Sequence, residues 1–119
     1  MRQRKHYILT KTAERDFRDA KTWSLKRWGA ELTHQYFKDL HKGAEYIAQN
    51  HRSLRERDDL TGETGLCVHP VREHYVIYTP LDTDKVIIVA LIRQTRDVPG
   101  ILKSHSYKIR QELNEVFDG

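Results

Sequence analysis

The sequence predicts an α+β fold in which a helical hairpin packs on one face of a small antiparallel sheet. Two observations carry this prediction. Apolar residues recur every three or four positions through residues 13–48, as they do along one face of an amphipathic helix. Three short runs rich in β-branched and aromatic residues then follow between residues 66 and 92, which is typical of strands. With a short apolar run before the helices and a helical pattern after the strands, the predicted order is β-α-α-β-β-β plus a C-terminal helix.

The first predicted elements are a strand over residues 7–9 and a helix that ends near Gly29. Thr12 fits the N-cap of this helix, because Glu14 and Asp16 would then lie in the first turn, where the helix dipole favours negative charge. Glycine is common just past the last turn of a helix, so Gly29 marks the stop.

A second helical pattern begins directly after Gly29. Its apolar residues are spaced by 4, 4, 4 and 3 positions and are Leu32, Tyr36, Leu40, Ala44 and Ile47. Because one glycine and little else separates the two amphipathic helices, the chain must fold back there as a hairpin.

A polar and turn-rich stretch over residues 50–65 predicts a long surface loop with a helical turn around Leu54. Three strands are predicted over residues 66–69, 75–79 and 86–92. Short turn segments join them, so we expect an antiparallel meander. The third run is apolar at every position, which predicts a central strand that is covered on both faces.

The last part of the chain carries a weaker helical pattern. Pro99 and Gly100 are expected to break the chain, and a C-terminal helix follows over residues 101–117. The 119 residues match the size of one domain, so residues 1–119 are predicted to form a single domain.

Charge is unevenly distributed along the chain. There are 21 Lys and Arg against 17 Asp and Glu, a formal net charge of +4. Residues 1–60 contain 14 basic and 9 acidic residues, a balance of +5, whereas residues 61–119 contain 7 and 8, a balance of −1. A basic first half suggests an anionic partner, either nucleic acid or an acidic protein segment, but two ordinary solvated helices would have the same composition.

Several classes of protein are excluded by the composition. The longest apolar run has seven residues, 86–92, against the ~20 that a membrane-spanning helix needs. Cys67 is the only cysteine, which excludes an internal disulfide and a cysteine-rich metal site and favours a reduced, cytoplasmic setting. The sequence has no Gly-rich phosphate loop, no HExxH motif and no zinc-spaced Cys/His pair. We therefore expect neither a cofactor nor a metal ion.

Basic and histidine side chains border the ends of the predicted strands. They could form a cationic patch that pairs with phosphates, or the base, cation and acid set of a metal-independent ribonuclease. They could equally be solvated side chains at strand ends. These residues are His69, Arg72, His74, Arg93 and Arg96.

Four aromatic residues lie along the two predicted helices: Trp23, Trp28, Tyr36 and Phe37. They could stack on nucleic-acid bases. Their helical spacing favours a place in the core, or in a groove that receives a helix of a partner protein.

The order of motifs resembles that of the RelE/ParE toxin superfamily over residues about 7–102, which leaves the C-terminal helix from about residue 101 as an extension. The resemblance rests on the order and spacing of these residues: Leu9-Thr10-x-x-Ala13-x-x-Asp16-Phe17, Arg27-Trp28-Gly29, Tyr36, Leu40 and Ile47-Ala48 on the helices, then Val71 to Tyr78, Val86 to Ile92 and Arg96-Asp97 on the sheet. The resemblance implies the fold deduced above. It also implies a toxin of a type II toxin–antitoxin module, neutralised by a partly disordered antitoxin.

The superfamily has two functional branches. RelE-like members are ribosome-dependent mRNA endonucleases, and ParE-like members block DNA gyrase. The RelE-like pattern has a basic residue just after the long loop and a Tyr or His near the C-terminus, and these positions fall near Leu66 and Cys67 and near Leu102 here. Arg96 matches an arginine that occurs in both branches. The hairpin junction and the Arg-Asp ending resemble the ParE-like branch.

The resemblance therefore implies a ParE-like toxin that inhibits gyrase without enzymatic activity. One alternative is a RelE-like endoribonuclease acting on ribosome-bound mRNA, with Arg72, Arg96, His69 and His74 at its site. Another is a non-toxic relative that acts with its antitoxin in operon autoregulation. The residues expected to bind the target are Arg72, His74, Arg93 and Arg96, and those expected to bind the antitoxin are Phe17, Trp23, Trp28, Tyr36, Phe37 and Leu40.

Overall fold

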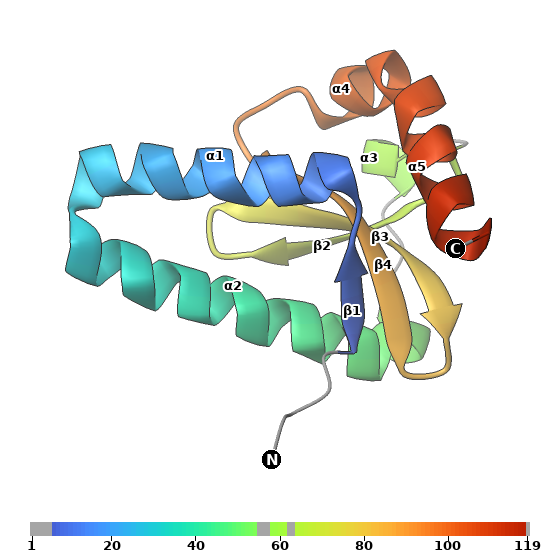
Figure 1. Ribbon diagram of the computed structural model, residues 1–119, viewed down its shortest axis with the longest axis horizontal. Coiled ribbons are helices and arrows are strands. Elements are labelled where there is room, and N and C mark those ends of the chain that lie inside the picture. Colours follow the sequence, from blue (N-terminus) through green and yellow to red (C-terminus); the bar gives the residue numbers. More distant parts are fainter. Residues whose placement is uncertain (1–5, 55–57, 62–63, 119) are drawn as a thin grey trace.

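The computed structural model describes residues 6–54, 58–61 and 64–118 and shows three layers (Figure 1). A four-stranded sheet lies in the middle. The helical hairpin covers one face of the sheet, and the C-terminal helices cover the other. The predicted α+β class and element order are confirmed.

Strand β1 (Tyr7–Leu9) leads directly into helix α1 (Lys11–Trp28). The N-cap of α1 is Thr10, whose side-chain oxygen accepts a hydrogen bond from the Ala13 backbone N–H at 3.2 Å. The prediction of Thr12 as the cap is wrong by two residues. Thr12 lies inside the first turn and is buried, and it has a different partner, described below.

Gly29 joins α1 to α2 (Ala30–Asn50), as predicted. Its φ of 85° lies in the region that residues with a Cβ avoid, which lets the chain reverse within one residue. The apolar stripes of the two helices face the sheet. Together with the sheet they form a first core that contains Phe17, Tyr36, Leu40 and Ile47.

The last three strands form the predicted antiparallel meander: β2 (Cys67–Val71), β3 (His74–Asp82) and β4 (Lys85–Arg93). The strand order is β1-β4-β3-β2, so β4 is central and buried on both faces, as expected. β1 pairs with β4 in parallel, which makes the sheet mixed rather than wholly antiparallel.

A β-bulge interrupts the β3–β4 ladder. Ile77 pairs with Ala90 and Tyr78 pairs with Ile88, so Val89 is an extra residue in β4. The Thr10 hydroxyl donates to the Val89 carbonyl at 3.3 Å and so provides a partner for this oxygen. The bulge shifts the alternation of β4 by one residue, and this sets the direction of its last residues up to Arg93.

The segment between the hairpin and the meander contains two short helical pieces, η1 (His51–Ser53) and α3 (Asp58–Thr61). The expected turn around Leu54 is therefore present just before that residue. Residues 55–57 and 62–63 of the predicted loop lie outside the described part of the chain.

Two helices, not one, follow β4: α4 (Val98–Ser104) and α5 (Ser106–Asp118). Pro99 does not break the chain. It lies in the first turn of α4, where a proline is tolerated because its missing N–H would have no helical partner. The Asp97 side chain caps this turn by accepting from the Gly100 N–H at 3.3 Å.

Helices α4 and α5 bury the second face of the sheet. Val98, Leu102 and Ile109 pack there against Ile87 and Val89 of β4. A carboxylate fixes α5 to the rest of the molecule: Glu112 accepts hydrogen bonds from the Thr12 N–H and the Thr12 hydroxyl, both at 2.9 Å. Within the described residues, no helix is long and apolar enough to cross a membrane.

Candidate functional site

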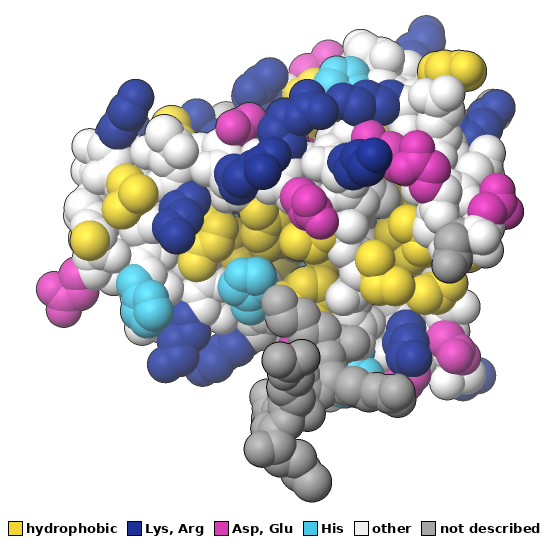
Figure 2. Space-filling model, in the orientation of Figure 1, with side chains coloured by type: hydrophobic (Ala, Val, Ile, Leu, Met, Phe, Trp, Pro, Cys, Tyr) yellow, Lys and Arg dark blue, Asp and Glu magenta, His cyan; other side chains and the backbone are white. Residues whose placement is uncertain are grey.

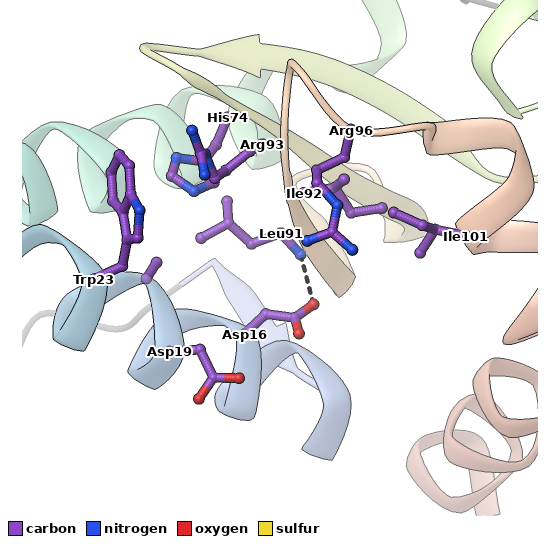
Figure 3. A pocket seen from close by; sticks show the side chains of 10 residues that line it. Asp16, Asp19, Trp23, His74, Leu91, Ile92, Arg93, Arg96 and Ile101 are labelled. Carbon is purple, nitrogen blue, oxygen red and sulfur yellow. Dashed lines mark hydrogen bonds between the residues drawn. The ribbon is translucent and has the colours of Figure 1, made fainter.

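A small pocket opens between α1 and the end of β4 (Figure 3). Its volume is about 280 Å³, near the lower end of the ~300–1,000 Å³ of ligand pockets. Figure 3 shows Asp16 and Asp19 on α1 at one side of the pocket and Arg93 and Arg96 across from them. The remaining lining residues are Ala20, Trp23, His74, Leu91, Ile92 and Ile101.

Trp23 holds two arginines at the edge of this pocket. The central guanidinium carbon of Arg93 lies 4.3 Å from the centre of the indole ring, and that of Arg27 lies 5.2 Å from it. Trp28 packs edge-on against the same indole, with ring centres 5.2 Å apart. A guanidinium stacked on an aromatic ring keeps N–H donors at its own edge. The indole thus brings two cationic side chains together beside the pocket.

His74 is a buried neutral group, with only 2% of its surface exposed. The Tyr36 hydroxyl accepts a hydrogen bond from the Glu73 N–H at 3.2 Å and shares a second hydrogen bond with Nδ1 of His74. Burial and the nearby Arg93 guanidinium lower the pKa of His74 from 6.5 to about 4. Among the four residues expected to bind the target as a cationic set, His74 therefore carries no positive charge at neutral pH.

Arg72 lies in the two-residue turn between β2 and β3, in the left-handed region with φ 57°. Its Nη1 donates to Oδ2 of Asp39 on α2 at 3.1 Å, and its guanidinium carbon lies 5.2 Å from the centre of the Tyr36 ring. The Gln94 side chain donates to the Arg72 carbonyl at 2.9 Å and fixes the turn to the residues after β4. The turn therefore presents Arg72 at the same end of the sheet as Arg93.

The two carboxylates of the pocket differ in their surroundings. Oδ2 of Asp16 accepts a hydrogen bond from the Leu91 N–H at 3.1 Å, and burial raises the pKa of this carboxyl group. Asp19, one helical turn further, is exposed. Asp16 thus fastens α1 to β4, while Asp19 is the solvated acidic group that faces the arginines.

A second and larger hollow runs along the outer side of α2, next to β1. It has a volume of about 1060 Å³. Figure 2 shows hydrophobic side chains exposed between α1 and α2 on this face, with histidine and basic side chains around them. We call this hollow the α2 groove; its lining residues are His6, Tyr7, His34, Phe37, Lys38, His41, Lys42, Glu45, Tyr46 and Gln49.

The residues expected to bind the antitoxin separate into two groups. Phe17, Tyr36 and Leu40 are 6%, 0% and 0% exposed and form part of the core, so they present almost no surface to a partner. The other three are partly exposed: Phe37 lines the α2 groove, Trp23 lines the pocket, and Trp28 packs between Trp23 and Tyr36.

Three of the cations at the predicted strand ends lie near one another in the fold. Arg93 and Arg96 share the pocket, and Arg72 lies close by over Tyr36. His69 does not line this pocket. It lies on β2 beside Tyr46 of α2, and burial lowers its pKa.

Three parts of the site were not predicted. They are the pairing of Arg27 with Trp23, the two aspartates of the pocket, and the polar lining of the α2 groove. The last had a usable signal, because His34, Lys38, His41 and Glu45 recur at helical spacing opposite the apolar stripe of α2.

Comparison with known proteins places the chain in a family. Residues 7–98 match the model of a family described as the ParE toxin of the type II toxin–antitoxin system, parDE. The chain belongs to the ParE toxin family. The matched region includes β1, the hairpin and the meander, and it ends at the first residue of α4.

Two relatives agree with this assignment. The chain is 27% identical over 94 residues to Toxin ParE of Escherichia coli, a match that covers 77% of this chain and 87% of the relative. A solved structure described as the chromosomal ParDE toxin–antitoxin system from P. aeruginosa has the same fold. Its TM-score is 0.61 at 12% identity, over 73% of this chain and 92% of that one. The resemblance to the ParE-like branch is therefore confirmed.

Proposed function

We propose that this ParE-family toxin inhibits DNA gyrase by binding to it in the cytoplasm, and that a cognate antitoxin neutralises it. The main support for the proposal is that this ParE-family chain has a pocket lined by two arginines. Arg93 and Arg96 are presented together at the end of β4, and Trp23 orients Arg93. Such a pocket suits the binding of an acidic group on a larger partner.

The same pocket does not favour bond cleavage. General acid–base catalysis needs groups that exchange protons near neutral pH and reach the substrate. The single histidine that lines the pocket is His74, which is buried, neutral and engaged by Tyr36. His69, the other histidine proposed for a ribonuclease, lies elsewhere on β2. Inhibition by binding therefore fits the described residues better than hydrolysis of RNA.

We assign the antitoxin to the α2 groove. Phe37 supplies an apolar surface in the groove, and the exposed Lys38 and Lys42 carry its positive charge. A segment with apolar residues flanked by Asp or Glu complements this lining. The groove and the pocket share no lining residue, so the antitoxin surface and the target surface are separate.

A supercoiling assay with purified chain and gyrase tests the proposal. We expect inhibition of supercoiling by the chain alone, and recovery when the antitoxin is added. Primer extension on mRNA in a translating extract is the companion measurement. Cleavage of mRNA at defined positions with unaffected supercoiling would show a RelE-like endonuclease instead. No effect in either assay would indicate a non-toxic relative that serves in operon regulation.

Variants separate the two surfaces. Lys38→Gln with Lys42→Gln should leave inhibition of gyrase intact but weaken neutralisation by the antitoxin. Since both lysines are exposed, the double variant should fold normally. Equal neutralisation of this variant and the original chain would place the antitoxin outside the α2 groove.

A further inference from the structure

The pocket between α1 and the end of β4 has walls of opposite charge. Asp16 and Asp19 line it from α1, and Arg93 and Arg96 lie across from them (Figure 3). His74, which also lines the pocket, is neutral at pH 7, because burial and the nearby Arg93 guanidinium lower its pKa to about 4. Two carboxylates therefore face two guanidiniums, and the lining as a whole favours neither a simple anion nor a simple cation.

The two walls do not neutralise each other. In the part of the chain that the structure describes, no ion pair joins either aspartate to either arginine. Oδ2 of Asp16 instead accepts a hydrogen bond from the Leu91 N–H at 3.1 Å, and the guanidinium carbon of Arg93 lies 4.3 Å from the centre of an indole ring. Asp19 and Arg96 are exposed, so their charged groups are accessible to a ligand that lies between the walls.

We propose that this pocket binds a free α-amino acid with an aliphatic side chain. The carboxylate and the ammonium group of such a ligand are bonded to the same carbon atom, so one small molecule complements both walls. The N–H groups of Arg93 and Arg96 donate to the carboxylate oxygens, and Asp19 accepts from the ammonium group. This goes beyond the proposed function, because it is a property of the chain alone and does not depend on gyrase being the target.

The rest of the lining suits an aliphatic side chain. Leu91 and Ile92 of β4 are each 6% exposed, and Ile101 of α4 is partly buried. The volume of about 280 Å³ is just below the ~300–1,000 Å³ of most ligand pockets, which suits a ligand of few atoms. An aliphatic side chain placed against these residues leaves water, and this adds to the affinity that the charged groups provide.

A small anion, such as phosphate or a lone carboxylate, is the competing ligand. It would pair with the arginines but would face Asp19 with no cation between them, and like charges placed opposite each other oppose binding. Asp97 follows Arg96 directly in the chain and adds a further negative charge. A large protein partner can offset this repulsion through contacts outside the pocket, whereas a small anion cannot. The ammonium group of an amino acid removes the repulsion.

Titration of the purified chain with L-leucine, without gyrase, tests this inference by amide NMR. We expect saturable shifts at Leu91, Ile101 and the Trp23 indole N–H, with a Kd of about 1 mM or lower. Such a Kd is within reach of a ligand with about nine non-hydrogen atoms. N-acetyl-leucine lacks the cation and leucine amide lacks the carboxylate, so each should bind about tenfold more weakly than leucine.

Variants test each wall separately. Asp19→Asn and Arg96→Gln each remove one exposed charge from the pocket, and each should weaken the binding of leucine about tenfold. The matched controls are Asp84→Asn, in the turn before β4 and thus at its other end, and Arg52→Gln in η1. Both controls remove an exposed charge of the same sign and should bind leucine as the original chain does. Thermal melting checks that all four variants are folded.

Four results would overturn the inference. The first is the absence of saturable shifts with leucine. The second is binding of N-acetyl-leucine as tight as that of leucine, which would show that the arginines alone bind the ligand. The third is equally tight binding of leucine amide, which would assign the ligand to the aspartates alone. The last is unchanged binding in both pocket variants. A chain that binds leucine but leaves gyrase active supports this inference and contradicts the proposed function, and a chain that inhibits gyrase without binding leucine does the reverse.

Discussion

The buried histidine beside the pocket makes the stability of this protein depend on pH. His74 has a pKa of about 4 in the folded chain against 6.5 for an unperturbed group, because it is buried and lies close to Arg93. The folded state therefore binds fewer protons than the unfolded state between these two values. The contribution of neutral His74 to the free energy of unfolding is fully present above pH 6.5 and is lost as the pH falls toward 4.

The size of the effect follows from the shift. Lowering the pKa of His74 from 6.5 to about 4 changes the free energy of unfolding by roughly 3 kcal/mol at most, at ~1.4 kcal/mol per pKa unit. Between pH 7.5 and pH 5.0, linkage predicts a loss of about 2 kcal/mol in the free energy of unfolding from His74 alone. Urea unfolding at both pH values measures it, and His74→Gln should remove this part of the loss.

Two further variants make this test decisive. His34→Gln, at an exposed position on α2, should keep the full pH dependence. Arg93→Gln removes a charge that lowers the pKa of His74, so its pH-dependent loss should be smaller. A direct measurement is the NMR titration of the His74 ring, expected near pH 4. If the free energy of unfolding fell by the same amount in His74→Gln and in the original chain between pH 7.5 and 5.0, the claim that His74 is buried in its neutral form would be refuted.

Three other predictions concern packing and the backbone. Glu112→Gln should lower the free energy of unfolding by about 1–2 kcal/mol, because the carboxylate that accepts from the Thr12 N–H and the Thr12 hydroxyl is lost. In a Thr12→Val background, which removes the hydroxyl and keeps the N–H, the same change should cost less in a double-mutant cycle. Gly43→Ala would place its Cβ 2.7 Å from both Val71 methyl carbons, so we expect a net loss of ~1–2 kcal/mol by urea unfolding; in a Val71→Ala background the same change should be neutral or stabilising. Gly29→Ala should cost about 1–3 kcal/mol through its φ of 85° alone, since no atom lies within 4 Å of the added Cβ; no change in thermal stability would contradict this.

Local patterns in the sequence account for much of this fold. Helical spacing on both sides of Gly29 was enough to predict the hairpin. The continuous apolar run of β4 was enough to predict a strand covered on both faces. These features depend on neighbours within one element or one turn. The N-cap was misplaced because Thr10 and Thr12 both precede acidic residues, and only the hydrogen bond to the Ala13 N–H distinguishes them.

Contacts between distant parts of the chain could not be predicted from local sequence patterns. β1 pairs in parallel with β4, and Glu112 binds Thr12 across 100 positions. Neither contact has a local signal. Pro99 is compatible both with a chain break and with the first turn of a helix, and the packing of α4 against β4 decides between them.

In the candidate site, too, features set by local sequence were predictable and those set by contacts between distant residues were not. The positions of Arg93 and Arg96 after an apolar strand predicted that they lie together at its end, and they do. The charge of His74 was not predictable, because its lowered pKa depends on burial and on the nearby Arg93 guanidinium of another strand. The role of Trp23 was missed for a similar reason: helical spacing places it near the core but does not reveal two guanidiniums over its ring.

Gyrase supercoiling with matched variants tests the central claim most directly. The assay compares the original chain with Arg93→Gln/Arg96→Gln, which removes both pocket arginines, and with Arg52→Gln/Lys85→Gln, which removes the same charge elsewhere. Circular dichroism confirms that all three are folded. The concentration needed for half-inhibition should rise at least tenfold for the pocket variant, or ~1.4 kcal/mol, and stay unchanged for the control. Equal inhibition by all three chains would contradict the assignment of toxicity to this pocket.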